Sequence, residues 1–120
     1  MLASWFNAEV KAGRVLVCDL VALELIRLTP NESRARDLAT RLDSFESIAM
    51  GAGLWKRARE LQLLLAPDGE HRRVPPADLL LAAAAEQSGV PLVHYDRDYE
   101  RLARVGALQQ LWFVPDGSLA

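Results

Sequence analysis

The sequence contains a single cysteine and no long apolar run, and both absences exclude classes of protein. Because Cys18 has no second cysteine to pair with, the chain cannot form an internal disulfide, which favours a cytoplasmic protein. Cys18 lies in the apolar stretch VLVC, where a buried structural thiol is favoured over a reactive one. No apolar run reaches the roughly 18 residues of a membrane span. The N-terminus MLASWFNAEV lacks the basic and apolar regions of a signal peptide. We therefore expect a cytoplasmic protein with no membrane association.

Several motifs of common enzyme classes are also missing. The 14 basic and 16 acidic residues leave a net charge of −2, so overall charge does not favour nucleic acid. An enzyme that holds RNA locally and screens its own acids with a divalent cation stays compatible with this balance. Neither G-x-G-x-x-G nor G-x-x-x-x-G-K is present, which argues against a glycine-rich phosphate loop. His71 and His94 are too few and too far apart for a zinc site with Cys18.

The apolar pattern predicts an alternation of helices and strands. Hydrophobic residues make up 51% of the 120 residues, enough for the core of one domain over residues 1–120. We expect an α/β fold, in which helices flank a mostly parallel sheet and sites form at the carboxyl ends of the strands. The apolar periodicity predicts helices over 2–12, 20–28, 32–43, 52–66, 76–88 and 97–105, and strands over 14–18, 46–49, 91–94 and 111–114.

Two aspartates follow the strand predicted in PLVHYDRDYERL. Asp96 comes directly after the strand, and Asp98 stands at the start of the next helix. A turn explains at least one of them, because aspartate caps helices and tolerates turn geometry. A metal at the end of the strand is the other explanation, and Asp96 is then the better ligand candidate.

Two further acids occur in apolar helices. Glu24 lies in LVALELIRL, where a carboxylate is costly to bury unless it is paired with a cation, and Arg27 at i+3 offers an ion pair. Asp78 is the one acid in the first turn of the helix PPADLLLAAAAE, where the helix dipole alone can favour it. Taken together, the acids follow strand-like elements, and hard cations such as Mg²⁺ prefer carboxylate oxygens. A shared site requires Glu24, Asp78 and Asp96 within roughly 4–8 Å of one centre.

The segments CDLVALELIRL and VPPADLLLAAAAEQSGVPLVHYDRDYERL resemble the PIN-domain ribonucleases. They are most similar to the VapC toxins of type II toxin–antitoxin systems, over most of the chain. The resemblance implies a PIN-like (Rossmann-like) parallel sheet and an endoribonuclease that uses Mg²⁺ or Mn²⁺. By this resemblance Glu24, Asp78 and Asp96 match the catalytic acids, and Asp98 matches a frequent neighbour that we count with Asp78 and Asp96 as a metal ligand. A VapB-type antitoxin and a homodimer are implied as partners.

Specific roles follow from this resemblance. Asp78 and Asp96 would hold the metal, and Glu24 would orient or deprotonate the attacking water. Three arginines are expected to contact RNA phosphates: Arg72, Arg73 and Arg97.

The sequence departs from the family pattern at its start. The family begins with a strand that ends in an aspartate, in a pattern like D-x-S-A, and no such motif is present. We therefore expect an N-terminally truncated PIN-like domain without the first strand and its aspartate, which puts metal affinity and catalytic activity in question. Two alternatives remain open: a non-catalytic PIN-like module that binds an antitoxin or another protein, and an unrelated α/β domain whose acids only cap helices.

Overall fold

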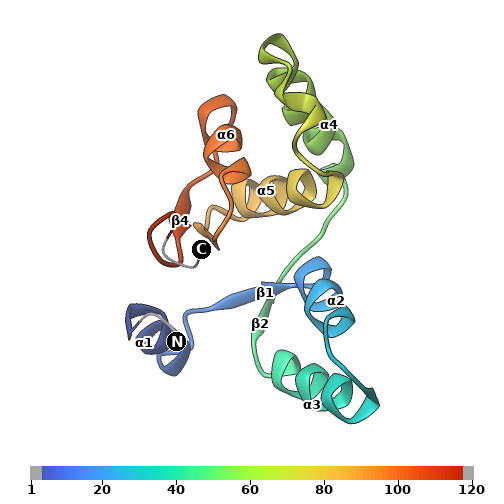
Figure 1. The fold of residues 1–120 in the computed structure, drawn as a ribbon, viewed down its shortest axis with the longest axis vertical. Coiled ribbons are helices and arrows are strands. Elements are labelled where there is room, and N and C mark those ends of the chain that lie inside the picture. The colour runs from blue at the N-terminus through green and yellow to red at the C-terminus, as the bar shows by residue number, and fades with distance from the viewer. Residues whose placement is uncertain (1–3, 118–120) are drawn as a thin grey trace. The chain divides into compact units, whose positions relative to one another are not determined.

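The computed structural model describes residues 4–117 and contains two compact units, one within residues 1–50 and one within residues 51–120. Figure 1 shows the chain from the blue N-terminal helix to the red C-terminal strand. Each unit contains one pair of parallel strands with helices between or beside them. We describe the two units separately.

The first unit follows a helix–strand–helix–helix–strand order. Strands β1 and β2 pair in parallel, with Leu16 opposite Glu46 and Cys18 opposite Ile48. The parallel pairing requires a crossover, and two helices supply it. Helix α3 begins where the side chain of Asn31 accepts a 3.0 Å hydrogen bond from the backbone N–H of Arg34, as an N-cap residue does. The elements are α1 (Ser4–Lys11), β1 (Leu16–Cys18), α2 (Asp19–Arg27), α3 (Glu32–Asp43) and β2 (Glu46–Ile48).

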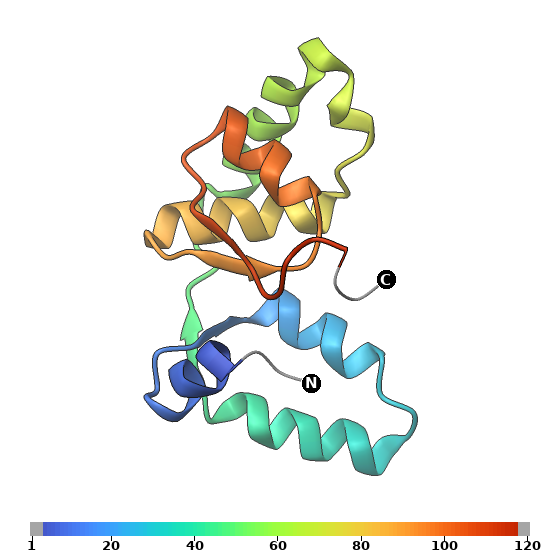
Figure 2. The same cartoon turned by 60° about the vertical axis from the view of Figure 1, so that its left-hand side comes forward.

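The second unit contains the larger core. Strands β3 and β4 pair in parallel, with Leu92 opposite Gln110 and His94 opposite Trp112. Helix α6 connects these two strands and packs against α4 and α5, which also contact each other (Figures 1 and 2). The elements are α4 (Leu54–Leu65), the short 3-10 helices η1 (Ala66–Asp68) and η2 (Glu70–Arg72), α5 (Pro76–Ser88), β3 (Leu92–His94), α6 (Asp98–Val105) and β4 (Gln110–Trp112).

Helix α5 is the centre of this unit. It begins at Pro76, whose fixed φ suits the first helical position. It ends at Gly89, which has a φ of 67° and donates its N–H to the carbonyls of Ala85 and Glu86. Small side chains let neighbouring helices approach closely, and four successive alanines of α5, residues 82–85, are buried. The helix therefore holds the residue in its first turn, Asp78, at a fixed place beside α6.

The contact between α5 and the end of α6 also depends on a glycine. A Cβ atom at Gly106 would lie 2.7 Å from both Glu86 Oε2 and Leu61 Cδ2, so a larger residue there would force these side chains to shift. Glu86 meanwhile accepts hydrogen bonds from the Arg57 guanidinium and from the backbone N–H of Ala107. These contacts tie α4, α5 and the segment after α6 together.

Most of the predicted elements are confirmed. The helix over 76–88 agrees with α5 at both ends, and the apolar face predicted for 52–66 is buried at Leu54, Ala58, Leu61 and Leu65. The helical spacing of the apolar residues also places Trp55 at the edge of this face, but its side chain is 75% exposed. Strand β4 begins and ends earlier than predicted, and the segment between the helices predicted over 52–66 and 76–88 contains η2 and the end of η1.

Three further expectations concern the chain as a whole. Leu2, expected to begin the first helix, lies outside the described residues, and the first element within them is α1. Within residues 4–117 no helix has the length and apolar character needed to cross a membrane. The single domain over residues 1–120 and the cytoplasmic location stay predictions.

Candidate metal centre

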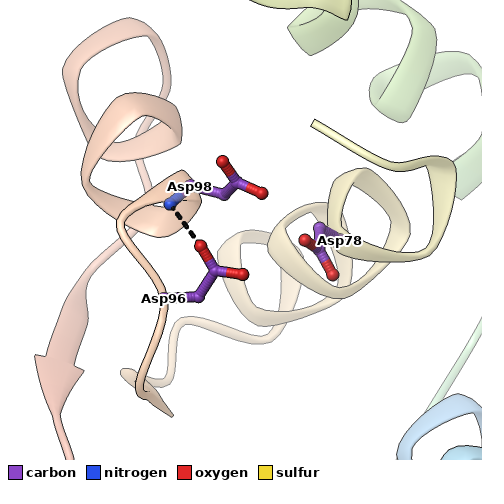
Figure 3. A group of neighbouring side chains, drawn as sticks. All are labelled: Asp78, Asp96 and Asp98. Atoms are coloured by element: carbon purple, nitrogen blue, oxygen red, sulfur yellow. Dashed lines mark hydrogen bonds between the residues drawn. The ribbon is translucent and has the colours of Figure 1, made fainter. Parts of the chain in front are cut away.

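Three carboxylates of the second unit converge at one place. Asp78 comes from the first turn of α5, Asp96 from the segment after β3, and Asp98 from the start of α6. One oxygen of each lies within 4.8 Å of the others. Figure 3 shows the Asp96 and Asp98 side chains directed toward the Asp78 carboxylate across the space between the two helices. Three of the four predicted acids therefore lie together, and Glu24 is not among them. We call Asp78, Asp96 and Asp98 the acid cluster.

The turn between β3 and α6 fixes Asp96. Its backbone N–H donates a 3.0 Å hydrogen bond to Nδ1 of His94, and its Oδ1 accepts a 2.9 Å bond from the backbone N–H of Asp98 (Figure 3). Aspartate often bonds the backbone two residues onward in this way. The two explanations offered for this pair of acids are therefore compatible, since one Asp96 oxygen forms the turn and the carboxylate also joins the acid cluster.

His94 supports this turn from the core. Because Nδ1 accepts a backbone N–H, the proton of the neutral imidazole is assigned to Nε2, which bonds the side-chain oxygen of Gln110 on β4. The His94 ring is 7% exposed, and its centroid lies 5.0 Å from the ring of Tyr99 and 4.7 Å from that of Trp112. His94 is thus a packed residue at the end of its strand.

Asp78 is half-buried and close to two other acids. Burial raises the pKa of its carboxyl above the usual 3.8, and the negative charges of Asp96 and Asp98 raise it further. The Tyr99 hydroxyl donates a 3.0 Å hydrogen bond to Asp78 Oδ1, which acts in the opposite direction and lowers the pKa. The mutual repulsion of these carboxylates is relieved when a cation binds between them.

Asp98 is the acid with the strongest internal partner. It is only 9% exposed, and its Oδ1 accepts a 2.8 Å hydrogen bond from Nη1 of Arg101, one turn onward on α6. Arg101 is itself held by Glu70 of η2, with Nε 2.6 Å from a Glu70 carboxylate oxygen. Glu70 also lies 3.5 Å from Nη2 of Arg104. An arginine therefore compensates the charge of Asp98, whereas Asp78 and Asp96 form no ion pair with an arginine within residues 4–117.

The donor set of the acid cluster suits a hard divalent cation. Carboxylate oxygens are the ligands that Mg²⁺ and Mn²⁺ prefer, and Mg²⁺ usually keeps several waters beside one or two carboxylates. Asp96 is exposed and Asp78 is half-buried, so the acid cluster lies at the surface of the second unit, where solvent reaches Asp96. The residues that are present fit the metal that the sequence predicts.

Glu24 belongs to the other unit. It lies on α2, its side chain is 51% exposed, and Nη2 of Arg27 lies 3.1 Å from its carboxylate. This is the i,i+3 ion pair that the sequence left open as an alternative. The role of Glu24 in catalysis stays a prediction.

The three arginines predicted to contact RNA differ in their surroundings. Arg72 and Arg73 are exposed, immediately before α5, and neither makes an ion pair with any residue in the described range 4–117. Arg97 is also exposed, but its Nε lies 2.7 Å from a carboxylate oxygen of Asp116. Arg72 and Arg73 are therefore more accessible to a phosphate than Arg97 is.

The sequence did not reveal the residues that hold the acid cluster. Tyr99 and Arg101 contact Asp78 and Asp98, and neither was a candidate. The one signal in the sequence is that Tyr99 and Arg101 follow Asp96 and Asp98 within about one helical turn. Side chains three or four residues apart on a helix lie on the same face and can contact one another. The bond from Tyr99 to a residue 21 positions earlier depends on how α5 and α6 pack.

With this geometry established, comparison with known proteins identifies the family. The PIN domain family matches residues 2–105. Ribonuclease VapC18 of Mycobacterium tuberculosis is 38% identical over 114 residues, which cover 93% of this chain and 83% of that protein. Ribonuclease VapC21 of the same organism is 34% identical over 110 residues, which cover 91% of this chain and 80% of that protein.

A solved structure shares the fold. It is a chain of the crystal structure of VapBC2 from Rickettsia felis bound to a DNA fragment from their promoter, with a TM-score of 0.71. The likeness covers 91% of this chain and 84% of that chain, at 19% sequence identity. The α/β fold of parallel strands and helices is thus confirmed as PIN-like. From these matches, the chain belongs to the PIN domain family and, within it, to the VapC ribonucleases.

Proposed function

We propose that this chain is a Mg²⁺-dependent endoribonuclease and acts as the toxin of a VapBC-type toxin–antitoxin system. The observation that carries the proposal is the acid cluster, in which three carboxylates from separate elements lie within 4.8 Å of one another. Its relatives are named ribonucleases, and a chain of similar fold comes from a VapBC complex.

In this proposal Asp78 and Asp96 hold the metal, and Asp98 completes the cluster. When bound, a divalent cation stabilises the developing negative charge on the phosphate and makes a water molecule more acidic. Asp98, already paired with Arg101, adds negative charge to the site without being fully available to the ion. Glu24 orients or deprotonates the attacking water, by the match to the family's acid on that helix.

Exposed arginines supply the contacts to RNA. Arg72 and Arg73 precede α5 by a few residues, and α5 carries Asp78 in its first turn. Guanidinium groups bind phosphate oxygens and position a strand without reading its sequence. Arg97 contributes less to binding, because a phosphate has to compete with Asp116 for it.

The partners are a VapB-type antitoxin and a second copy of the chain. Large exposed apolar patches on a protein surface mark interaction sites for other proteins. An open groove of about 490 Å³ between α4 and α5, lined by Trp55, Ala58, Leu79 and Leu80 among others, offers such a surface. Large apolar side chains are also exposed on α2, at the residue that follows it and on α4, at Leu23, Leu25, Leu28, Leu63 and Leu64.

Cleavage of RNA tests the catalytic proposal. Purified protein is incubated with single-stranded or structured RNA in Mg²⁺ and, separately, in excess chelator. We expect cleavage in Mg²⁺ alone, and its loss in Asp96→Asn. Asp68→Asn is the matched control, because Asp68 is an exposed aspartate of η1 in the same unit that is not part of the cluster. Equal rates for Asp96→Asn and the wild-type protein would remove Asp96 from the mechanism.

A non-catalytic module that binds a protein is the second candidate. The open apolar groove between α4 and α5 favours it, since a binding partner needs such a surface whether or not the acids work. Calorimetry separates the two functions. Two results together would favour the module: an antitoxin peptide binds, and Mn²⁺ does not bind with a Kd below about 1 mM. A Kd of about 1 mM corresponds to a binding free energy near −4 kcal/mol.

A further inference from the structure

The first turn of α6 supplies a hydrogen-bond donor to every carboxylate of the acid cluster. The backbone N–H of Asp98 donates to Asp96 Oδ1 at 2.9 Å, and the Tyr99 hydroxyl donates to Asp78 Oδ1 at 3.0 Å. Arg101 Nη1 donates to Asp98 Oδ1 at 2.8 Å. One rigid helical turn therefore contacts all three acids at once.

The bond from Tyr99 differs from the other two. It joins α6 to α5, whereas the others lie within the turn before α6 or within α6 itself. Tyr99 is 7% exposed, and its ring packs against His94, so its hydroxyl has little freedom to point elsewhere. The bond therefore restricts the orientation of the Asp78 carboxylate, whose oxygens lie near those of Asp96 and Asp98.

The chemistry of the donor also matters. A phenol is neutral, so it orients a carboxylate and leaves its charge available to a cation, whereas the guanidinium of Arg101 compensates much of the charge of Asp98.

We propose that Tyr99 is a positioning residue of the metal centre, whose hydroxyl holds the Asp78 carboxylate in the orientation in which it binds a divalent cation together with Asp96. The inference rests on the proposed function, because it assigns a residue to the same site. It goes beyond the packing role that a buried aromatic ring has in any core. The ring fills space, and the hydroxyl acts on the metal ligand.

Replacement of Tyr99 by phenylalanine tests the hydroxyl alone. Tyr99→Phe keeps the ring and its contact with His94, so the variant retains the packing of α6. Loss of a group that orients a metal ligand typically weakens metal affinity about 10- to 100-fold. We expect a loss of that size in Mn²⁺ affinity, measured by electron paramagnetic resonance of free Mn²⁺.

A second readout separates positioning from stability. In the RNA cleavage assay, the Mg²⁺ concentration for half-maximal rate should rise in Tyr99→Phe by a similar factor, and saturating Mg²⁺ should restore most of the rate. Tyr95→Phe is the matched control, since it removes a phenol hydroxyl from the segment between β3 and α6 and leaves the Tyr99 bond to Asp78 in place. Its Mn²⁺ affinity should equal that of the wild-type protein.

The outcomes distinguish this inference from the proposed function. Wild-type protein that binds no Mn²⁺ would overturn the metal site and the role of Tyr99 with it. A wild-type protein that binds Mn²⁺, together with an unchanged or tighter affinity in Tyr99→Phe, would overturn only the role of Tyr99. Equal losses in Tyr99→Phe and Tyr95→Phe would also overturn it, because they would show a general disturbance of the turn.

Discussion

The backbone N–H of Asp98 donates a 2.9 Å hydrogen bond to the side chain of Asp96. This bond turns the chain from β3 into α6 and at the same time places two carboxylates side by side (Figure 3). The repulsion that results is a cost to the metal-free protein, and it is the same property that gives the site affinity for a cation. Structure and function thus depend on the same two residues.

The three acids of the cluster should contribute unequally to metal binding. Asp78 and Asp96 have no arginine partner among the described residues, whereas Asp98 is paired with Arg101 at 2.8 Å. We therefore expect Asp78→Asn and Asp96→Asn to weaken Mn²⁺ affinity more than Asp98→Asn does, as measured by isothermal calorimetry. A larger loss in Asp98→Asn than in the other two would contradict the ranking.

Metal binding should weaken in mild acid. Burial and the neighbouring acids raise the pKa of Asp78 above 3.8, and a carboxylate must lose its proton to bind a metal. As pH falls through this raised pKa, Asp78 takes up a proton and Mn²⁺ affinity falls. The stability of the fold depends on the Asp78 proton in the opposite direction. The contribution of Asp78 to the free energy of unfolding is present at low pH and is lost as pH rises through its raised pKa in the folded protein. Calorimetry between pH 7 and pH 4 checks the metal effect, and a constant affinity would contradict it.

Stability of the second unit should depend on Glu86. The Arg57 hydrogen bonds, and to a lesser degree the Ala107 N–H, hold the pKa of Glu86 below its usual 4.5. This stabilisation is present above pH 4.5 and is lost as pH falls through the lowered pKa. Because the pair is partly exposed, we expect Glu86→Gln to cost about 1–2 kcal/mol at pH 7. Urea unfolding measures it.

The control is the pH dependence of the difference in unfolding free energy between Glu86→Gln and the wild-type protein. The difference in unfolding free energy between Glu86→Gln and the wild-type protein should narrow as pH falls below 4.5 and through the lowered pKa of Glu86, because the Glu86 carboxyl then takes up a proton and becomes neutral like glutamine. Mn²⁺ affinity should be the same in the two proteins at pH 7. A gap that stays constant with pH would show that the charge of Glu86 is not what stabilises the contact with Arg57.

RNA affinity should depend on Arg72 and Arg73 more than on Arg97. Each arginine that neutralises one phosphate adds about 0.7 to the slope of log affinity against log salt for a single strand. We expect Arg72→Gln and Arg73→Gln to reduce that slope, and Arg97→Gln to change it less because Asp116 already holds Arg97. Fluorescence anisotropy in an Asp96→Asn background measures binding without cleavage. A larger change for Arg97→Gln would contradict this assignment.

Local patterns were enough to predict most of the fold. The proline at 76 and the glycine at 89 set both ends of α5, and the apolar periodicity of α4 identified its buried face. Trp55 was the exception, because an aromatic residue at the edge of an apolar face can lie on either side of the boundary. Strand β4 was shifted because the pairing of Gln110 with Leu92 depends on a partner strand far away in sequence.

The acid cluster could be predicted only in part. Asp78, Asp96 and Asp98 were candidates because each stands where a strand or helix begins or ends, and the structure brings them together. The contacts that hold them depend on tertiary packing, as with Tyr99 and Asp78, or on a distant partner, as with Arg101 and Glu70. A sequence pattern does not contain that information.

Localisation of Mn²⁺ by anomalous X-ray diffraction tests the central claim most directly. Crystals of the protein are grown with Mn²⁺, and the anomalous signal gives the position of the ion without reference to activity. We predict a single strong peak bound by carboxylate oxygens of Asp78 and Asp96, with Asp98 beside it and the Tyr99 hydroxyl still bonded to Asp78. A peak elsewhere on the molecule, or no peak at saturating Mn²⁺, would contradict the proposal that these three acids form a metal centre.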